Sequence, residues 1–236
     1  MNSRSTSKVL IIIPAYNESE NIVKAVSSVV EAGYDYIVVN DGSTDDTLKI
    51  CIEHNFNVIN LRQNLGIGGA VQTGHMYAQK HDYDIDIQFD GDGQHDILYA
   101  ANLIEVIEGG KDLAIGSRYL KKTDGFQSTF LRRLGKSWLS VLIRLLFKVE
   151  VTDPTSGFRA CGKRAIDLFA NNYPIDYPEP ESIVSAVKRG LSVEEVSVRM
   201  NERIGGESSI KALSSIYFMI KVSLAIFILR CFKGDK

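Results

Sequence analysis

Apolar and polar positions along the first half of the chain predict strands and helices in alternation. Residues 9–13 form an unbroken, β-branched apolar run, which is typical of a strand covered on both faces. Similar runs alternate with segments whose apolar residues recur at helical spacing. The expected strands are residues 9–13, 36–39, 57–61, 85–89 and 113–115, and the expected helices are 18–32, 44–54, 66–81 and 97–108. This alternation predicts right-handed crossovers and a mainly parallel sheet.

The second half of the chain predicts a long amphipathic helix over residues 131–149. Its apolar arc includes Leu134, Trp138, Val141 and Leu145, and basic residues lie on the opposite arc. A basic amphipathic helix is typical of a membrane surface, but an ordinary helix packed on the domain core shows the same pattern. The helix alone leaves both interpretations open.

The C-terminal tail is strongly apolar but is interrupted by Lys221 and Arg230. As a helix, residues 216–232 would be about 25 Å long, short of a hydrocarbon core of about 30 Å. A lysine near the middle of a bilayer costs about 2.5–3.5 kcal/mol. We therefore expect a helix at the bilayer interface or against a membrane-embedded partner, with burial in the protein's own core as the alternative. A late strand is expected over residues 193–200.

Length and composition narrow the class of protein. The 236 residues, 44% of them hydrophobic, suit one α/β domain or two small ones. A formal net charge of -2 does not indicate a nucleic-acid binder. The three cysteines are scattered with no CxxC spacing, so we expect a reducing compartment. Residues 1–8 are polar, so no signal peptide is expected and the cytoplasmic side is favoured.

Polar turns follow three of the expected strands, at residues 14–18, 40–45 and 90–93. Ligands of open α/β sheets bind at the carboxyl ends of strands, so these turns are expected to meet in one crevice. Asp90 and Asp92 stand one residue apart in a glycine-punctuated turn. Two such carboxylates can hold a hard divalent cation, and the cation can hold a diphosphate. The phosphate-loop pattern is absent, and residues 66–69 match a dinucleotide fingerprint only faintly.

Several motifs together resemble the family 2 glycosyltransferases with a GT-A fold, and most closely the polyprenyl-phosphate sugar synthases that include dolichol-phosphate mannose synthase. The motifs occupy residues 14–18, 40–47, 90–95, 116–119, 153–159 and 203–209, so the resemblance covers about residues 9–211. It implies an α/β catalytic domain over residues 1–205, with a mainly parallel sheet flanked by helices. Residues 206–236 would be a C-terminal apolar helix that associates with a membrane or a partner.

The resemblance also implies roles for individual residues. Asp92, helped by Gln94, would coordinate Mg²⁺ or Mn²⁺. Asp92 and Arg118 would be catalytic, because a metal and a cation stabilise the charge on a departing nucleoside diphosphate. The residues implied to bind the nucleotide sugar are Pro14, Ala15, Tyr16, Glu18, Asp41, Asp90 and Gly91.

A lipid phosphate acceptor is already ionised near neutral pH, so it needs cations more than it needs a base. The candidate cations for this phosphate are Arg132, Arg133, Arg203 and Lys211. Many such synthases have a lysine where this chain has Ser209, so Lys211 would make the phosphate contact of that lysine here. Glu181 would serve as catalytic base for a hydroxyl acceptor, or would simply favour a helix N-terminus.

The resulting expectation is an inverting transferase that moves a hexose or N-acetylhexosamine, UDP-linked rather than GDP-linked, to a polyprenyl phosphate. The product would be a lipid-linked monosaccharide for cell-envelope glycans. The expected location is peripheral, on the inner face of the cell membrane, with a small integral-membrane partner or direct surface anchoring, and a homo-oligomer is allowed. Three alternatives stay open: a transferase that extends a saccharide hydroxyl, a non-catalytic nucleotide-sugar-binding subunit and, more weakly, a metal-dependent phosphohydrolase.

Overall fold

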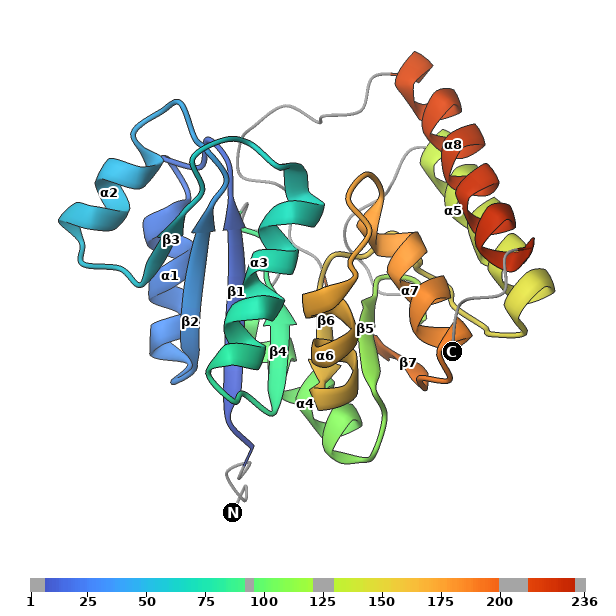
Figure 1. The fold of residues 1–236 in the computed structure, drawn as a ribbon, viewed down its shortest axis with the longest axis horizontal. Helices are drawn as coiled ribbons and strands as arrows, with labels where there is room; N and C mark the ends of the chain where they lie inside the picture. Colours follow the sequence, from blue (N-terminus) through green and yellow to red (C-terminus); the bar gives the residue numbers. More distant parts are fainter. Residues whose placement is uncertain (1–6, 92–95, 121–129, 200–211, 232–236) are drawn as a thin grey trace.

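The protein is a layered α/β structure in which helices lie on both faces of one sheet (Figure 1). The computed structural model describes residues 7–91, 96–120, 130–199 and 212–231, with backbone alone for 130–133 and 212–218. The strands are β1 (Val9–Ala15), β2 (Asp35–Asn40), β3 (Val58–Asn60), β4 (Ile85–Gln88), β5 (Leu113–Ser117), β6 (Arg159–Gly162) and β7 (Val193–Ser197). The helices are α1 (Ile22–Glu31), α2 (Thr47–Glu53), α3 (Gly66–Lys80), η1 (Ile97–Tyr99), α4 (Ala100–Glu108), α5 (Phe130–Phe147), α6 (Lys163–Asn171), α7 (Pro178–Lys188) and α8 (Ala212–Cys231).

The sheet has seven strands in the order β3-β2-β1-β4-β6-β5-β7. Strand β6 runs antiparallel to both of its neighbours, β4 and β5, and the other pairings are parallel. The prediction of a mainly parallel sheet is therefore confirmed. Because β2, β1 and β4 are adjacent and parallel, the carboxyl ends of these three strands lie side by side.

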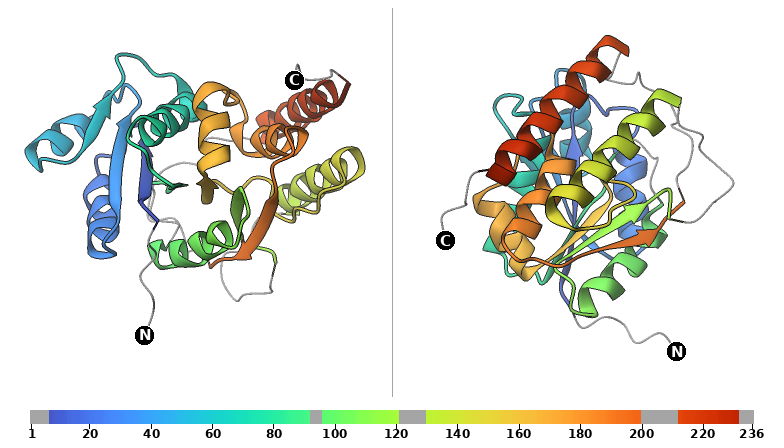
Figure 2. Two further views of the ribbon diagram at one scale, coloured as in Figure 1. Left: turned by 60° about the horizontal axis from the view of Figure 1, so that its bottom comes forward. Right: turned by 90° about the vertical axis from the view of Figure 1, so that its right-hand side faces the viewer.

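Alternation along the strands divides the core into two layers. Leu10 and Ile12 of β1 face one side of the sheet, where α3, α6 and α7 pack. Ile11 and Ile13 face the other side, covered by α1 and α4. All four side chains are fully buried, which explains the unbroken apolar run. Figure 2 shows the two helical layers from further directions.

Strand β6 and helix α6 were not predicted from the sequence. The strand has only four residues and begins with Arg159, so it lacks an apolar run. Its backbone is nevertheless paired on both edges, by β4 and by β5. A strand in this position is formed by its neighbours rather than by its own propensity.

Helices α5 and α8 lie side by side and pack on α7 at the end of the molecule that carries β5 and β7 (Figure 2). Trp138 of α5 donates its indole N–H to Ser223 Oγ of α8 over 2.9 Å. Val222 and Ile226 of α8 are fully buried, whereas Leu224 is exposed. One face of α8 thus belongs to the core, and the other faces outward. Among the described residues, no helix has the length and apolar character to cross a membrane.

Most of the apolar arc predicted for α5 faces outward rather than toward the core. Leu134, Trp138, Val141 and Leu145 are all exposed, and Leu139 and Ile143 make the buried contacts. The pattern therefore identified an amphipathic helix: these four residues of the predicted arc face outward, Leu142 and Val149 of the same arc pack partly against the core, and Leu139 and Ile143 are fully buried in it.

Candidate active site

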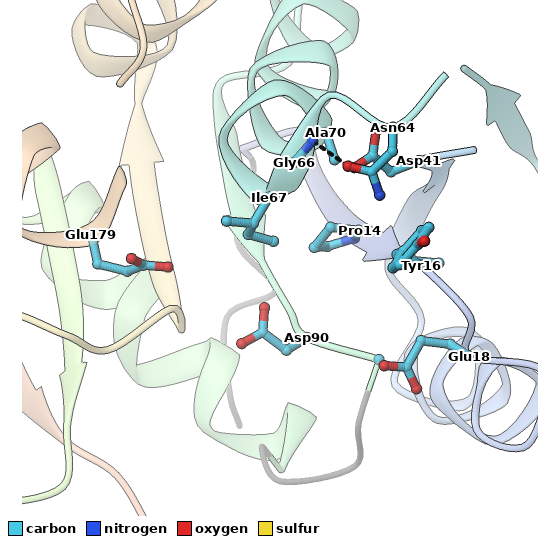
Figure 3. Close-up of a pocket in the computed structure, with 12 residues that line it drawn as sticks. Pro14, Tyr16, Glu18, Asp41, Asn64, Gly66, Ile67, Ala70, Asp90 and Glu179 are labelled. Atoms are coloured by element: carbon cyan, nitrogen blue, oxygen red, sulfur yellow. Dashed lines mark hydrogen bonds between the residues drawn. The ribbon is translucent and has the colours of Figure 1, made fainter. Parts of the chain in front are cut away.

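A pocket of about 450 Å³ opens at the carboxyl ends of β1, β2 and β4 (Figure 3). All seven residues predicted to bind a nucleotide sugar line it. Its lining consists of Pro14, Ala15, Tyr16, Glu18, Asp41, Asn64, Gly66, Ile67, Ala70, Asp90, Gly91 and Glu179. The sequence missed Asn64, Gly66, Ile67, Ala70 and Glu179. The glycine-rich start of helix α3 was the available signal for the first four, because small residues let a ligand approach a helix N-terminus.

The turns after β1 and β2 are joined by side-chain hydrogen bonds. Asn17 has a positive φ of 55°, which asparagine tolerates better than most residues. Its Oδ1 accepts from the Thr44 N–H over 2.8 Å, and its own N–H donates to Ser43 Oγ over 3.0 Å. The Glu18 N–H donates to Thr47 Oγ1 over 2.8 Å. These bonds hold the first two predicted turns together as one wall of the pocket.

Asp41 is buried at the end of β2 and fixes a third segment of the wall. Its Oδ1 accepts a hydrogen bond of 2.7 Å from the Leu65 N–H, just before α3. Gly42 is required beside it, because a Cβ there would lie 2.8 Å from the Asn64 nitrogen and φ is +66°. The Asp41 carboxylate is therefore held in place before any ligand arrives.

Asp90 lies across the pocket from these turns, at the end of β4. Gln88 Nε2 donates to Asp90 Oδ1 over 3.1 Å. The loop that precedes β6 packs closely against it, since a Cβ on Gly157 would lie 2.8 Å from Asp90 Oδ2. Carboxylate oxygens are the ligands that Mg²⁺ and Mn²⁺ favour, so the chemistry of Asp90 fits the predicted cation.

Arg118 is held by a buried aspartate beyond the end of β5. Its Nε and Nη2 donate to the two carboxylate oxygens of Asp153 over 2.6 and 2.7 Å, and Nη2 also donates to Thr155 Oγ1 over 3.1 Å. Burial would lower the pKa of the guanidinium, but Asp153 outweighs it and the pKa is raised. Asp153 is thus the anchor that orients the predicted catalytic cation.

The structure separates the two glutamates at the start of α7. Glu179 lines the pocket, on the opposite side from Tyr16 and Asp41, with Asp90 between them (Figure 3). Burial raises the pKa of the Glu179 carboxyl, and nearby Arg159 partly offsets this. Glu181, the residue predicted as base, is not among the pocket-lining residues; burial and then Asp176 raise its pKa. A carboxylate does face the site, but it comes two residues earlier than predicted.

Several predicted residues lie outside the described part of the chain. These are Asp92, Gln94, Arg203 and Lys211, and for Arg132 and Arg133 only the backbone in the first turn of α5 is described. One turn further along α5, the Lys136 ammonium lies 3.7 Å from the centre of the Tyr119 ring. Burial lowers the pKa of Lys136; Asp153 counteracts this, and Arg118 adds to it. Arg118 and Lys136 therefore lie near one another, and Arg118 lies near Asp90, but neither cation is among the residues that line the pocket.

One group of described side chains offers ligand atoms for a metal ion away from this pocket. His75, Asp86 and Cys161 are all buried, and their ligand atoms lie within 4.8 Å of one another. His75 Nδ1 lies 2.7 Å from Asp86 Oδ2, which is a hydrogen-bond distance. None of the three lines the pocket, so this cluster is separate from the cation predicted at Asp92.

The fold and the pocket define an α/β protein of the GT-A type. Its sequence matches the profile described as "Glycosyl transferase family 2" over residues 10–169. The chain belongs to this family of glycosyltransferases.

Individual relatives extend the comparison. The chain is 32% identical over 212 residues to a UDP-N-acetylglucosamine–dolichyl-phosphate N-acetylglucosaminyltransferase of Methanococcus voltae, covering 81% of this chain and 84% of the relative. It is 29% identical over 231 residues to a polyprenol monophosphomannose synthase of Mycolicibacterium smegmatis, covering 93% and 87%.

Among solved structures, glucosyl-3-phosphoglycerate synthase of Mycobacterium tuberculosis, in complex with phosphoglyceric acid, superposes with a TM-score of 0.71 at 20% identity, covering 98% of this chain and 82% of that one. The same enzyme with Mn²⁺ and UDP-glucose gives a TM-score of 0.69 at 20% identity, covering 98% and 81%. At this identity the likeness establishes the fold alone.

Proposed function

We propose that this chain transfers a hexose or N-acetylhexosamine from a UDP-sugar to a polyprenyl phosphate, with inversion at the anomeric carbon. The main observation behind the proposal is that the residues Tyr16, Asp41 and Asp90, which follow three strands, line one pocket together with Glu179. The relatives named above support the acceptor class, because one acts on dolichyl phosphate and one makes a polyprenol-linked mannose. The donor class is supported by the structural neighbour that binds UDP-glucose.

The donor would lie across the pocket with its base near Tyr16 and Asp41 and its diphosphate near Asp90. Asp41 is already oriented by Leu65, so its remaining carboxylate oxygen can accept from the base. Mg²⁺ or Mn²⁺, held by Asp92 with Gln94, would neutralise charge on the diphosphate. Arg118, oriented by Asp153, would stabilise the negative charge that develops on the departing nucleoside diphosphate.

The acceptor phosphate would approach from the side of the pocket that carries Arg118 and Lys136. Among the described residues, Lys136 makes no ion pair in direct contact, although Asp153 and Glu195 lie near enough to raise its pKa against the effect of burial. Its ammonium would therefore be a contact for an incoming phosphate. A phosphate oxygen attacks the anomeric carbon while the bond to the diphosphate breaks on the opposite face, and the bonding electrons leave with UDP. Arg132, Arg133, Arg203 and Lys211 stay proposed as further phosphate contacts.

The outer surface of α5 and α8 would bring this site to the membrane. Helical spacing places the exposed apolar residues on one stripe of each helix, and the two helices lie side by side. These residues are Leu134, Trp138, Val141 and Leu145 of α5 and Ile220, Leu224, Phe227 and Ile228 of α8. Exposed apolar stripes of this kind are typical of an interaction site, and a lipid acceptor makes the bilayer its natural partner. Attachment through a small integral-membrane protein is the alternative.

The test is transfer of radiolabelled sugar into a lipid extract by the purified chain. The assay contains a panel of UDP- and GDP-sugars, polyprenyl phosphate and Mg²⁺ or Mn²⁺. A lipid-linked monosaccharide is expected from a UDP-sugar, and Asp92→Ala is expected to lose most of the transfer. Undiminished transfer by Asp92→Ala refutes the metal role. Tight UDP binding without transfer to any acceptor would instead support the non-catalytic subunit.

A second candidate function follows from the position of Glu179. A carboxyl that lines the donor pocket and has a raised pKa has the properties of a general base for a hydroxyl acceptor. Glu179→Gln would then abolish transfer to a saccharide. Under the lipid-phosphate proposal, the same variant retains transfer, because the acceptor is already ionised.

A further inference from the structure

Arg159 is a buried arginine in the middle of the sheet, at the start of β6. Its side chain is 3% exposed, and its Cα is paired with Gln88 of β4. A guanidinium keeps its charge under all ordinary conditions, so burying it is costly unless its donors are satisfied. The charge therefore needs well-placed acceptors in the surrounding backbone.

Four hydrogen bonds engage four of the five N–H donors of this guanidinium, and no described carboxylate accepts any of them. Nε donates to the Ser156 carbonyl over 2.6 Å, and Nη2 donates to the Pro154 carbonyl over 3.0 Å. Nη1 donates to the Glu179 carbonyl over 2.6 Å and to Ser182 Oγ over 2.7 Å. The planar fork thus joins two segments that are separate in the chain, in a geometry that a single ammonium cannot reproduce.

One of these segments is the loop that precedes β6. Asp153, next to the bonded Pro154, orients Arg118. Gly157, next to the bonded Ser156, packs against the Asp90 carboxylate. The position of this loop therefore determines where two groups of the proposed active site lie.

The other segment is the first turn of α7. The Glu179 carbonyl accepts from Arg159, while the Glu179 side chain lines the pocket opposite Tyr16 and Asp41 (Figure 3). The Ser182 hydroxyl, one turn further, also donates to the Glu179 carbonyl over 3.1 Å. Arg159 therefore holds in place, by hydrogen bonds, the turn that places Glu179 on the side of the pocket opposite Tyr16.

We propose that Arg159 is a positioning residue that sets the sugar end of the donor pocket by holding the Asp153 loop against the Glu179 turn. The inference rests on the proposed function, because the sugar end is the end away from Tyr16 and Asp41. Arg159 touches neither substrate in this arrangement, and it acts through Asp153, Arg118 and Glu179. Loosening it should disturb transfer while leaving the nucleotide end intact.

The experiment compares Arg159→Lys with the matched control Arg164→Lys. Arg164 of α6 pairs with Asp112, and neither residue lines the pocket. Arg159→Lys is expected to lower kcat by about tenfold or more, because small misplacements of reacting groups have large effects on rate. Its Kd for UDP with Mn²⁺, measured by calorimetry, should stay within about twofold of wild type, since the nucleotide end is unchanged. Arg164→Lys should change neither quantity.

Binding measurements make the outcome independent of turnover. Wild type is expected to distinguish UDP from UDP-glucose or UDP-N-acetylglucosamine in affinity, and Arg159→Lys is expected to reduce that difference. If wild type transfers no sugar to any acceptor, the proposed function fails while this binding comparison still tests Arg159. Wild-type kcat in Arg159→Lys, or a parallel loss of UDP affinity and kcat, would overturn the inference.

A second variant covers the case in which Arg159→Lys does not fold. Ser182→Ala removes one of the four bonds without touching the pocket lining. It should lower kcat by up to about fivefold, the effect of one hydrogen bond, with UDP affinity unchanged. An unchanged kcat in a folded Ser182→Ala, or equal losses in both quantities, would contradict the proposal.

Discussion

Carboxylates from different elements give this site its chemistry, and each is held differently. Asp41 and Asp90 follow strands and Glu179 is in the first turn of α7, and all three line the pocket, whereas Asp153 lies in the loop before β6. Asp41 accepts a hydrogen bond from the Leu65 backbone, and Asp90 accepts one from the Gln88 side chain. Asp153 forms an ion pair with Arg118. Burial raises the pKa of the Glu179 carboxyl, and Arg159 partly offsets this. Their roles therefore differ although the side chains are chemically alike.

Asp41→Asn is expected to raise the Kd for UDP by about tenfold or more. The substitution replaces a charged acceptor at the proposed base end, and hydrogen bonds to charged groups contribute about 1.5–3 kcal/mol. Calorimetry with UDP and Mn²⁺ measures the change. Asp46→Asn is the control, because Asp46 is exposed and makes no side-chain capping bond. Equal affinities in wild type and Asp41→Asn would exclude Asp41 from nucleotide binding.

Glu179→Gln is expected to stabilise the free protein increasingly as pH rises. Burial raises the pKa of the Glu179 carboxyl in the folded protein above its value in the unfolded protein. The free energy of unfolding of wild type therefore decreases as pH rises through the pKa of the folded state, whereas the Gln variant has no carboxyl to ionise. Toward pH 4 and below, the carboxyl is increasingly protonated in the folded and the unfolded protein alike, so the Tm of wild type and variant should converge. Thermal unfolding from pH 4 to pH 8 checks the sign, with exposed Glu20→Gln as control. A Tm difference that shrinks with rising pH would contradict the burial of Glu179.

At the scale of elements, α5 and α8 each carry two apolar stripes with different tasks. Ile143 and Ile226 are fully buried, whereas Leu145 and Ile220 point outward. Periodicity in the sequence revealed apolar residues in both helices but could not rank the stripes. Packing against α7 and against each other decides which stripe is covered.

Buried and exposed isoleucines of α8 are expected to separate stability from membrane binding. Ile226→Ala should lower the free energy of unfolding by about 2–5 kcal/mol, because it leaves a cavity. Ile220→Ala should change it by no more than about 0.5 kcal/mol. Urea unfolding measures both.

Exposed and buried positions of α8 are expected to give opposite results on membranes. Ile220→Gln combined with Leu224→Gln should weaken sedimentation with phospholipid vesicles by about tenfold or more, since both exposed side chains lose apolar burial. Ile226→Ala, assayed below its unfolding temperature, should sediment like wild type. Vesicle binding that is unaffected by the double variant would rule out this face as the membrane contact.

At the scale of the whole molecule, ligand binding should couple the two walls of the pocket. Tyr16 and Asp41 come from one side, and Glu179 comes from α7 on the other (Figure 3). UDP with Mn²⁺ at about 100 times Kd should add about 2.7 kcal/mol to the free energy of unfolding. Chelation with EDTA should remove most of this gain, as read from Tm. A Tm increase with UDP that is the same in EDTA would contradict the predicted cation.

Much of the fold was predictable because the strands are apolar runs separated by helical spacing. The apolar runs at residues 9–13 and 85–89 predict strands without any knowledge of the strands that pair with them. The observed strands, Val9–Ala15 and Ile85–Gln88, have bounds close to those predicted. Strand β6 was missed because its pairing with β4 and β5 comes from residues far away in the chain. Lys136 was assigned to the polar side of α5, since nothing in its spacing indicates Arg118 and Tyr119 as neighbours.

What the sequence by itself determined was local: the order of strands and helices, the turns at 14–18 and 40–45, and the family to which they belong. Only the tertiary structure shows that Glu179 lines the pocket and that Glu181 is not among its lining residues. On a helix, side chains two positions apart are separated by about 200° of rotation about the helix axis. They therefore project from nearly opposite faces and meet different surroundings. Which of them meets the pocket depends on how α7 is anchored, and Arg159 makes that contact from another part of the chain.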